Sequence, residues 1–260
     1  MPLRTIPQTC RGIVRRLTAA GGDELDADAL MAGLHLGERA PADRPYTIVN
    51  FAASADGRAT VDGQSGGLGG AADRRVFRAL RSAADGVMVG TGTLRAESYG
   101  RLVKDPARRD ARVARGLAPE PLACTVTRGG RLPTAIPLWA EPEARVIVFS
   151  GAVIEDFGAR AQLEVVRMDP AELTMGAALA HLRGHDGVRL LLCEGGPGLF
   201  TALLRERLVD ELYLTVAPKL VAGESLALTA GDGLDPPAGL ALEWVLEEAG
   251  SLFLRYAVRN

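Results

Sequence analysis

The segment at residues 189–204, RLLLCEGGPGLFTALL, constrains the fold of this chain most, because it combines a strand, a glycine turn and a helix start. Residues 190–193 are apolar without alternation, which predicts a central strand covered on both faces. Three glycines lie among the four residues after Glu194, and Pro197 is typical of a first helical turn. The free N–H groups of such a helix start favour a phosphate. The segment therefore predicts a phosphate-binding turn beside a carboxylate, and the alternative is a tight turn that binds no ligand.

Other apolar runs alternate with helical patterns, which predicts a mixed α/β sheet with parallel crossovers. Strands are predicted at residues 46–53, 87–89, 122–127, 146–149 and 162–167, and helices at residues 73–84 and 174–183. The chain ends in predicted strands at residues 210–218, 241–247 and 251–258, of which the last two form a closing hairpin.

Composition narrows the functional class. Of the 260 residues, 47% are hydrophobic and 24% are charged, as in ordinary globular proteins. The net charge of −2 does not support a nucleic-acid or membrane partner, and no apolar run is long enough to span a bilayer, so we expect a cytoplasmic protein. A polar, proline-bearing stretch at residues 38–45 predicts that a helical arm over residues 1–43 precedes the main domain at residues 44–260.

This sequence lacks the motifs that are typical of metal-dependent, acyl-transfer and ATP-dependent enzymes. The H-E-x-x-H, G-x-S-x-G and G-x-x-x-x-G-K-[ST] patterns are absent, as is the H-x-E with P-C-x-x-C pattern of deaminases. The histidines lie in polar or helical stretches, and the cysteines are odd in number and far apart: His35, His181, His185, Cys10, Cys124 and Cys193. We therefore predict no metal site.

Several predicted strands end in small residues, glycine or threonine. The small residues at 52–54 leave room for a flat group such as a nicotinamide ring, although small residues also serve packing alone. Residues 90–93, GTGT, resemble the start of a dinucleotide fingerprint, but Arg95 replaces its third glycine. Thr127 and Arg128 offer a hydroxyl and a guanidinium to a phosphate, unless Arg128 is simply exposed in a turn. Together these loops predict an extended phosphorylated cofactor along the sheet edge.

Motifs in a fixed order strengthen this interpretation. They are ASADGR at 53–58, DGQS at 62–65, VGTGTLR at 89–95, EGGP at 194–197, LVDEL at 208–212 and APK at 217–219. This succession resembles the reductase domain of bacterial riboflavin-biosynthesis deaminase-reductases, from about residue 44 to the C-terminus. The resemblance implies a dihydrofolate-reductase-like three-layer α/β fold with a central mixed, mostly parallel sheet and a C-terminal antiparallel hairpin. It also implies a homodimer that reduces 5-amino-6-(5-phosphoribosylamino)uracil with NADPH, here as a stand-alone reductase because the deaminase motifs are absent.

Carried over by position, the resemblance places a series of strand-end and turn residues against the cofactor. They are Ala52, Gly92, Thr93, Glu97, Thr127, Arg128, Ser150, Gly195, Gly196, Pro197, Gly198 and Leu199. Arg128 is the expected partner of a 2′-phosphate, and no acidic residue is clearly placed to hold a free 2′-hydroxyl. The sequence therefore favours NADPH over NADH.

On the substrate side, Asn50, Ser65, Arg81 and Glu194 match family positions. Arg101 and Lys104 belong to a basic cluster that is either a solvated surface or a source of cations for the 5′-phosphate. Three departures concern the substrate more than the cofactor. Asn50 stands where many members carry lysine, Glu97 where many carry aspartate, and Gly67 where an aromatic residue is common.

The expected reaction is hydride transfer to C1′ of the ring-opened, imine form of the substrate, followed by protonation. Glu194 and Asn50 would hold sugar hydroxyls, while Asp56 would assist proton movement unless it only bonds its own turn. Two alternatives stay open. The first is a reductase of dihydrofolate or another pterin on the same fold, and the second is a nucleotide-binding protein without catalysis.

Overall fold

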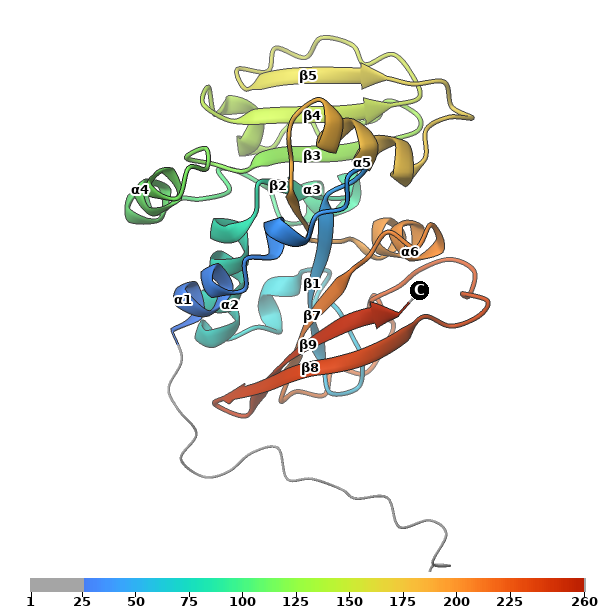
Figure 1. Ribbon diagram of the computed structural model, residues 1–260. Coiled ribbons are helices and arrows are strands. Elements are labelled where there is room, and N and C mark those ends of the chain that lie inside the picture. The colour runs from blue at the N-terminus through green and yellow to red at the C-terminus, as the bar shows by residue number, and fades with distance from the viewer. Residues whose placement is uncertain (1–25, 260) are drawn as a thin grey trace, which may run out of the picture.

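The computed structural model describes residues 26–259, so the N-terminal part of the predicted arm and Cys10 lie outside the described residues. Its centre is a nine-stranded sheet with the order β5-β4-β3-β2-β6-β1-β7-β9-β8 (Figure 1). In chain order the strands are β1 (Tyr46–Ser54), β2 (Gly86–Met88), β3 (Leu122–Thr127), β4 (Arg145–Ser150), β5 (Gln162–Arg167), β6 (Leu190–Cys193), β7 (Glu211–Ala217), β8 (Gly239–Glu248) and β9 (Ser251–Arg259). All pairs from β5 to β7 are parallel, whereas β9 is antiparallel to both β7 and β8. The predicted mostly parallel sheet with a closing antiparallel hairpin is confirmed.

The helices form a layer on each face of the sheet. They are α1 (Ala27–Gly33), α2 (Ala71–Ala83), α3 (Thr91–Ala96), α4 (Pro106–Ala114), α5 (Met175–Gly184) and α6 (Pro197–Arg205), with 3-10 turns η2 (Leu36–Arg39), η3 (Ser65–Gly67) and η4 (Pro137–Ala140). Met31 of α1 and Leu80 of α2 belong to one hydrophobic cluster, whereas Leu179 of α5 and Phe200 of α6 belong to another. Figure 1 shows α1 and α2 apart from α5 and α6. The predicted three layers are therefore present.

Strand β6 lies at the middle of the sheet, between β2 and β1. Its residues alternate between the two clusters: Leu190 and Leu192 pack in the one that contains α2, and Leu191 and Cys193 in the one that contains α5. This alternation explains the uninterrupted apolar run, because both faces of β6 are covered. The strand begins and ends at the residues that the sequence predicted.

The described part of the N-terminal segment packs into the core. Helix α1 begins after Asp26, whose carboxylate accepts a hydrogen bond from the backbone N–H of Ala29 at 2.8 Å. Met31 and Leu36 are 2% exposed and join the cluster that contains α2. A boundary at residue 43 remains a prediction, but residues 31–36 contribute directly to the main core.

The parallel register brings the carboxyl ends of three strands to one edge of the sheet. Cys193 of β6 pairs with Val49 of β1 on one side and with Met88 of β2 on the other. The segments that follow these positions therefore start side by side. This edge is where an open parallel sheet binds its ligand. Within residues 26–259, no helix is both long and apolar enough to cross a bilayer.

Candidate active site

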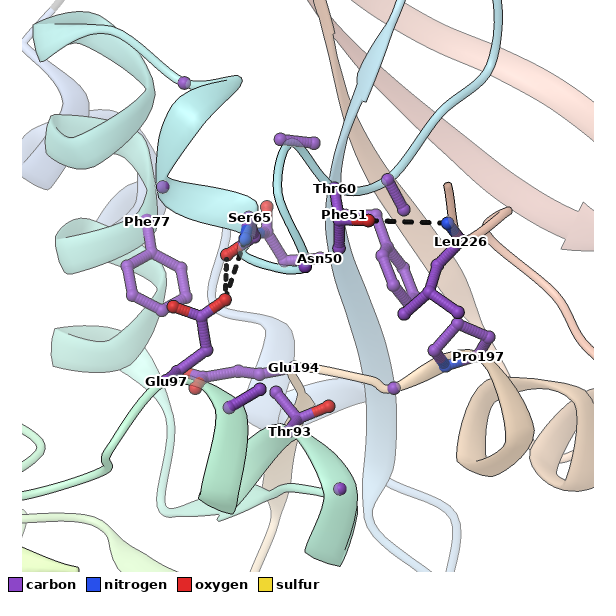
Figure 2. Close-up of a pocket in the computed structure, with 18 of the residues that line it drawn as sticks. Asn50, Phe51, Thr60, Ser65, Phe77, Thr93, Glu97, Glu194, Pro197 and Leu226 are labelled. Atoms are coloured by element: carbon purple, nitrogen blue, oxygen red, sulfur yellow. Dashed lines mark hydrogen bonds between the residues drawn. The ribbon is translucent and has the colours of Figure 1, made fainter. Parts of the chain in front are cut away.

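A cavity of about 270 Å³ opens at this sheet edge. Strand β1, the loop before α2, helix α2, helix α3 and the turn between β6 and α6 all contribute to its wall (Figure 2). The wall includes many of the residues that the sequence analysis singled out, namely Asn50, Ala52, Ser65, Gly92, Thr93, Glu97, Glu194, Gly196 and Pro197. Residues from five separate segments thus meet at one cavity.

The turn after β6 requires glycine at two successive positions. Gly195 has a φ of +78°, and a Cβ there would lie 2.6 Å from Cζ of Phe51. A Cβ on Gly196 would lie 2.8 Å from Oγ1 of Thr93. The backbone N–H of Gly90 donates to the carbonyl of Gly195 at 2.7 Å, which fastens the loop after β2 to this turn. The loop after β2 is therefore packed against this turn, and Gly195 has no room for a side chain.

Helix α6 begins directly after this turn. Gly196 is its N-cap and provides no side-chain hydrogen bond, and Pro197 occupies the first turn, as the sequence predicted. The first backbone N–H groups of a helix have no partner within the helix. The start of α6 therefore presents donors and partial positive charge beside the cavity.

Glu194 is held by two side chains from other elements. Nε of Arg81 donates to Oε1 of Glu194 at 2.6 Å, and Nη2 donates to Oε2 at 2.7 Å. The hydroxyl of Tyr99 donates to Oε2 at 2.6 Å. The side chain of Glu194 is only 2% exposed and that of Arg81 is 15% exposed, so this pair is largely shielded from solvent. We call these three residues the cavity cluster.

The cavity cluster keeps its donors protonated. Burial and the negative charge of Glu194 raise the pKa of Tyr99 well above its usual value. For Arg81, burial opposes the charged form, but the carboxylate of Glu194 outweighs it and the pKa is raised. The guanidinium also lies 4.3 Å from the ring centre of Phe77. The carboxylate of Glu194 consequently has a fixed orientation.

Two further carboxylates line the cavity. Glu97 accepts hydrogen bonds from the backbone N–H and the hydroxyl of Ser65, at 2.7 and 2.9 Å (Figure 2). The carboxylate of Asp73 packs against Gly69: a Cβ on Gly69 would lie 1.9 Å from Oδ2 of Asp73. Burial raises the pKa of Asp73, although a hydrogen bond from Thr215 partly opposes this. The glycines before α2 thus leave space for carboxylates.

A second cavity of about 460 Å³ adjoins the first. Arg74 and Phe77 line both, so these two side chains form the boundary between them. Arg78, Arg81 and Lys104 also line the second cavity, which is therefore strongly basic. Within residues 26–259, neither Arg78 nor Lys104 has an ion pair or a side-chain hydrogen bond. Their charges are available to an anion.

Arg101, which the sequence suggested as a source of cations for the 5′-phosphate, lies outside both cavity walls. This side chain lines neither cavity, because its guanidinium pairs with three carboxylates: Glu120 at 3.1 Å, Glu141 at 3.1 Å and Glu143 at 2.8 Å. The basic pattern around it gave no indication of these acidic partners, which lie about 20 to 40 residues further along the chain. Arg101 is thus engaged in ion pairs, and a contact with a phosphate stays a prediction.

Asp56 also lies outside the cavity. Its carboxylate accepts hydrogen bonds from the hydroxyl of Ser54 and from the backbone N–H groups of Val221 and Ala222. These bonds lower the pKa of Asp56 to about 2, so it carries no proton to deliver at neutral pH. The alternative interpretation, a side chain that only bonds its own turn, does not describe it either, because two of its donors lie about 165 residues further along the chain. It joins the turn after β1 to the segment after β7.

The remaining predicted cofactor residues follow the same sheet edge outside the cavity wall. Thr127 ends β3, and its hydroxyl donates to the carbonyl of Arg131 at 3.3 Å. Ser150 ends β4 and donates to the carbonyl of Ala152 at 2.7 Å. Arg128 is exposed. Gly198 and Leu199 lie in the first turn of α6. Their contacts with a cofactor stay a prediction.

Comparison with known proteins agrees with this arrangement. Residues 45–248 match the family model described as RibD C-terminal domain. The chain belongs to this family. It is 31% identical to the 2,5-diamino-6-ribosylamino-4(3H)-pyrimidinone 5′-phosphate reductase of Archaeoglobus fulgidus, over 69% of this chain and 83% of that protein. The reductase of the same name from Methanothermobacter thermautotrophicus is 30% identical over 75% of this chain and 88% of that protein. The family predicted from the motifs is confirmed.

A solved structure shares the fold. The pyrimidine reductase-like protein of Corynebacterium diphtheriae superimposes with a TM-score of 0.74 at 22% identity, over 91% of this chain and all of that one. Reductases of this family use a nicotinamide cofactor, and the residues present fit one. Gly92 lies in the cavity wall with no atom within 4 Å of the place for its Cβ, which leaves room for a flat ring near Ala52.

The sequence analysis missed several residues of the wall, notably Asp73, Phe77 and Tyr99. Phe77 is an apolar residue of the predicted helix at residues 73–84, and such a residue usually serves packing. Tyr99 follows the glycine-threonine motif closely, but no local pattern indicated that its hydroxyl reaches Glu194, 95 residues further along the chain. Its position after a cofactor loop was the only available signal.

Proposed function

We propose that this protein is an NADPH-dependent reductase that converts the ribosyl group of a ribosylaminopyrimidine 5′-phosphate to a ribityl group. The observation that carries the proposal is the cavity cluster, which orients Glu194 beside the glycine turn before α6. When bound, the reduced nicotinamide would supply the hydride. The task of the protein is then to orient the substrate, to exclude water and to compensate charge.

Glu194 is suited to hold a sugar hydroxyl. Within the described part of the chain, its Oε1 accepts a single hydrogen bond, from Arg81, whereas a carboxylate oxygen can accept two. Because Glu194 lines the cavity, the remaining position is directed to a ligand. Asn50 and Ser65 lie in the same wall and offer an amide and a hydroxyl for further contacts. These groups would fix the open-chain sugar so that its C1′ faces the hydride.

The second cavity is suited to the 5′-phosphate of the substrate. Lys104, Arg78 and Arg81 line it, and Arg81 also contacts Glu194. Phe77 separates this cavity from the first, so a sugar chain that passes Phe77 would join the two sites. Of the phosphate ligands that the sequence suggested, Arg81 and Lys104 line this cavity and Arg101 does not. We expect Lys104→Gln to raise KM for the substrate and to leave NADPH affinity unchanged.

The cofactor would extend from the cavity along the sheet edge. Ala52, Gly92 and Thr93 would contact the nicotinamide, and the start of α6 would bind the pyrophosphate. Arg128 is exposed at the end of β3, where it is free to pair with a 2′-phosphate. This placement supports NADPH over NADH. Arg128→Gln should therefore narrow the difference in kcat/KM between the two cofactors.

An assay of NADPH oxidation tests the proposal with three substrates. The 2,5-diamino pyrimidinone named for the relatives and the corresponding uracil differ in the group at C2, and both are offered at equal concentration, with dihydrofolate as the third substrate. We expect turnover with at least one ribosylaminopyrimidine phosphate and none with dihydrofolate. Turnover with dihydrofolate alone would identify a pterin reductase. Stoichiometric NADPH binding without oxidation of any substrate would identify a non-catalytic nucleotide-binding protein.

We also propose a homodimer in the cytoplasm. Strand β8 is the last strand of the sheet and leaves Leu240 and Leu242 about half exposed, at 47% and 46%. Such an apolar edge suits a second copy of the chain. Light scattering during size-exclusion chromatography measures the mass directly. A monomer at micromolar concentration would contradict the dimer without affecting the proposed reaction.

A further inference from the structure

We propose that Glu164, His181 and His185 form a binding site for a divalent transition-metal ion, with Zn²⁺ as the probe. His181 lies in α5 and His185 is its C-cap residue, four positions later, so the two rings occupy the same side of the helix end. Glu164 comes from β5, beneath this helix. One nitrogen of each imidazole and one oxygen of Glu164 all lie within 4.8 Å of one another. Two elements thus contribute three ligand atoms to one place.

Buried polar atoms without hydrogen bonds give a second, independent indication. Asp186 follows His185, and its side chain is only 3% exposed. Among the residues that the structure describes, neither its Oδ2 nor the buried Nε2 of His181 has a hydrogen-bond partner. These two atoms are 3.7 Å apart, which is too far for a hydrogen bond. Two ligands of one tetrahedral zinc ion, each about 2.0–2.2 Å from the metal, are separated by roughly 3.4 Å, so this gap suits a shared ion.

The surroundings hold the imidazoles in place. The ring of His181 meets Phe149 edge to face at a centroid distance of 5.5 Å, and it lies 4.8 Å from the ring of His185. Oδ1 of Asp186 is 3.8 Å from Nδ1 of His185 and 3.7 Å from a guanidinium nitrogen of Arg145. Because the Arg145 side chain is 55% exposed, it can turn to solvent when a cation binds. Asp186 would then complete or support the site.

The ligand chemistry selects the metal class. Two imidazoles with one or two carboxylates suit Zn²⁺, Co²⁺ and Ni²⁺, whereas Mg²⁺ and Ca²⁺ prefer oxygen ligands alone. No metal site was predicted from the sequence, because no known metal-binding motif occurs in it. Here Glu164 lies 17 residues before His181, and the topology brings it beneath α5.

The site would connect an edge strand to its covering helix. Strand β5 ends the sheet and has a single neighbour, β4. None of Glu164, His181, His185 and Asp186 lines either cavity described above. We therefore expect the metal to raise the thermal stability of the protein, with little effect on kcat.

Equilibrium dialysis of tag-free, EDTA-treated protein against Zn²⁺, followed by elemental analysis, tests the proposal. Thermal unfolding with and without Zn²⁺ gives a second readout, since a ligand that binds the native state raises Tm. We expect one Zn²⁺ per chain and a higher Tm. Glu164→Gln and Asp186→Asn should each weaken binding by at least about tenfold, and the double variant His181→Gln/His185→Gln should abolish it. Tetrahedral Co²⁺ bands should appear in the wild type and disappear in the double variant.

His35→Gln provides the matched control, because His35 is exposed and lies in another part of the fold. It should bind Zn²⁺ as the wild type does. Glu164 is exposed, so Glu164→Gln remains a valid test even if the double variant fails to fold. The proposal is overturned if the wild type binds no Zn²⁺, or if Glu164→Gln or the double variant binds it as tightly as the wild type. If His181 and Asp186 form only an ion pair with each other, the wild type will bind no Zn²⁺.

Discussion

Two buried clusters built from the same residue types, namely glutamate, arginine and tyrosine, lie at opposite ends of the parallel strands. In the cavity cluster, Glu194 follows the carboxyl end of β6 and binds Arg81 and Tyr99. In the second, which we call the closed cluster, Glu211 begins β7 and accepts hydrogen bonds from several side chains. These are Arg255, Tyr213, Tyr46 and Arg39. Each cluster contains a glutamate held by two guanidinium nitrogens of one arginine.

The clusters differ in how many acceptor positions remain. In the closed cluster, Oε1 of Glu211 accepts from Arg255, Tyr46 and Arg39, and Oε2 accepts from Arg255 and Tyr213. Burial and the charge of Glu211 raise the pKa of Tyr46 to about 12. In the cavity cluster, Oε1 of Glu194 accepts from Arg81 alone among residues 26–259. A buried Arg–Glu pair alone is therefore no sign of function, whereas an acceptor left open towards a cavity is.

Breaking the closed cluster should have the largest effect on stability. Glu211→Gln leaves the guanidinium of Arg255, which is 5% exposed, without a counter-charge, and such a loss costs about 3–5 kcal/mol of unfolding free energy. Urea unfolding measures this change. The folded fraction of the variant should retain the wild-type kcat/KM within about a factor of two. A selective loss of activity with unchanged stability would remove the distinction between the two clusters.

Matched substitutions of one tyrosine in each cluster test whether the two clusters have different roles. Tyr99→Phe deletes the hydroxyl that orients Glu194, and we expect kcat/KM to fall about tenfold, or ~1.4 kcal/mol. Tyr213→Phe is the matched substitution in the closed cluster. It should lower the unfolding free energy by ~1–2 kcal/mol without changing kcat/KM. Steady-state kinetics and urea unfolding of both variants measure these effects. An equal loss of kcat/KM in the two variants would contradict the assignment of Tyr99 to activity and of Tyr213 to stability.

The smallest expected effect concerns Asp73, a cavity carboxylate with no arginine partner among residues 26–259. Burial raises its pKa above the ordinary 3.8, so the folded protein binds this proton more tightly than the unfolded chain does. The stabilising contribution is complete below pH 3.8 and is lost as the pH rises through the folded pKa. Asp73→Asn should therefore be more stable than the wild type at pH 7, by ~1 kcal/mol, and equal to it in acid. A difference in unfolding free energy between Asp73→Asn and the wild type that grows towards low pH would contradict this pH dependence.

The sequence predicted local structure well where the pattern itself determines it. Strand β6 and the start of α6 at Pro197 were predicted to the residue, since a run of apolar residues, two crowded glycines and a proline specify them. The NADPH-type cofactor path was also inferred from strand ends. The part of that path on β1, β2 and β6 comes together because these parallel strands end at one edge of the sheet, and the remainder stays a prediction.

The sequence could not identify which charged residues pair across the fold. Arg78 and Arg81 occupy similar positions in one basic helix, yet only Arg81 reaches Glu194. Arg112 belongs to the basic stretch that also contains Arg101 and Lys104, which we interpreted as a solvated loop or helix or as a supply of cations for phosphate. Its side chain is instead fully buried and donates to the carbonyls of Arg81, Ser82 and Ala84. Such pairings depend on how helices pack on the sheet, which no local pattern encodes.

The most direct test of the central claim is the Glu194→Gln variant, measured both by NADPH oxidation and by titration of NADPH fluorescence. If the open acceptor of Glu194 serves the substrate, kcat/KM should fall by at least about 100-fold while the Kd for NADPH stays within about twofold. Glu211→Gln, measured in parallel, controls for the loss of a buried charge. A large loss of NADPH affinity, or turnover equal to that of the wild type, would contradict the assignment of Glu194 to the substrate.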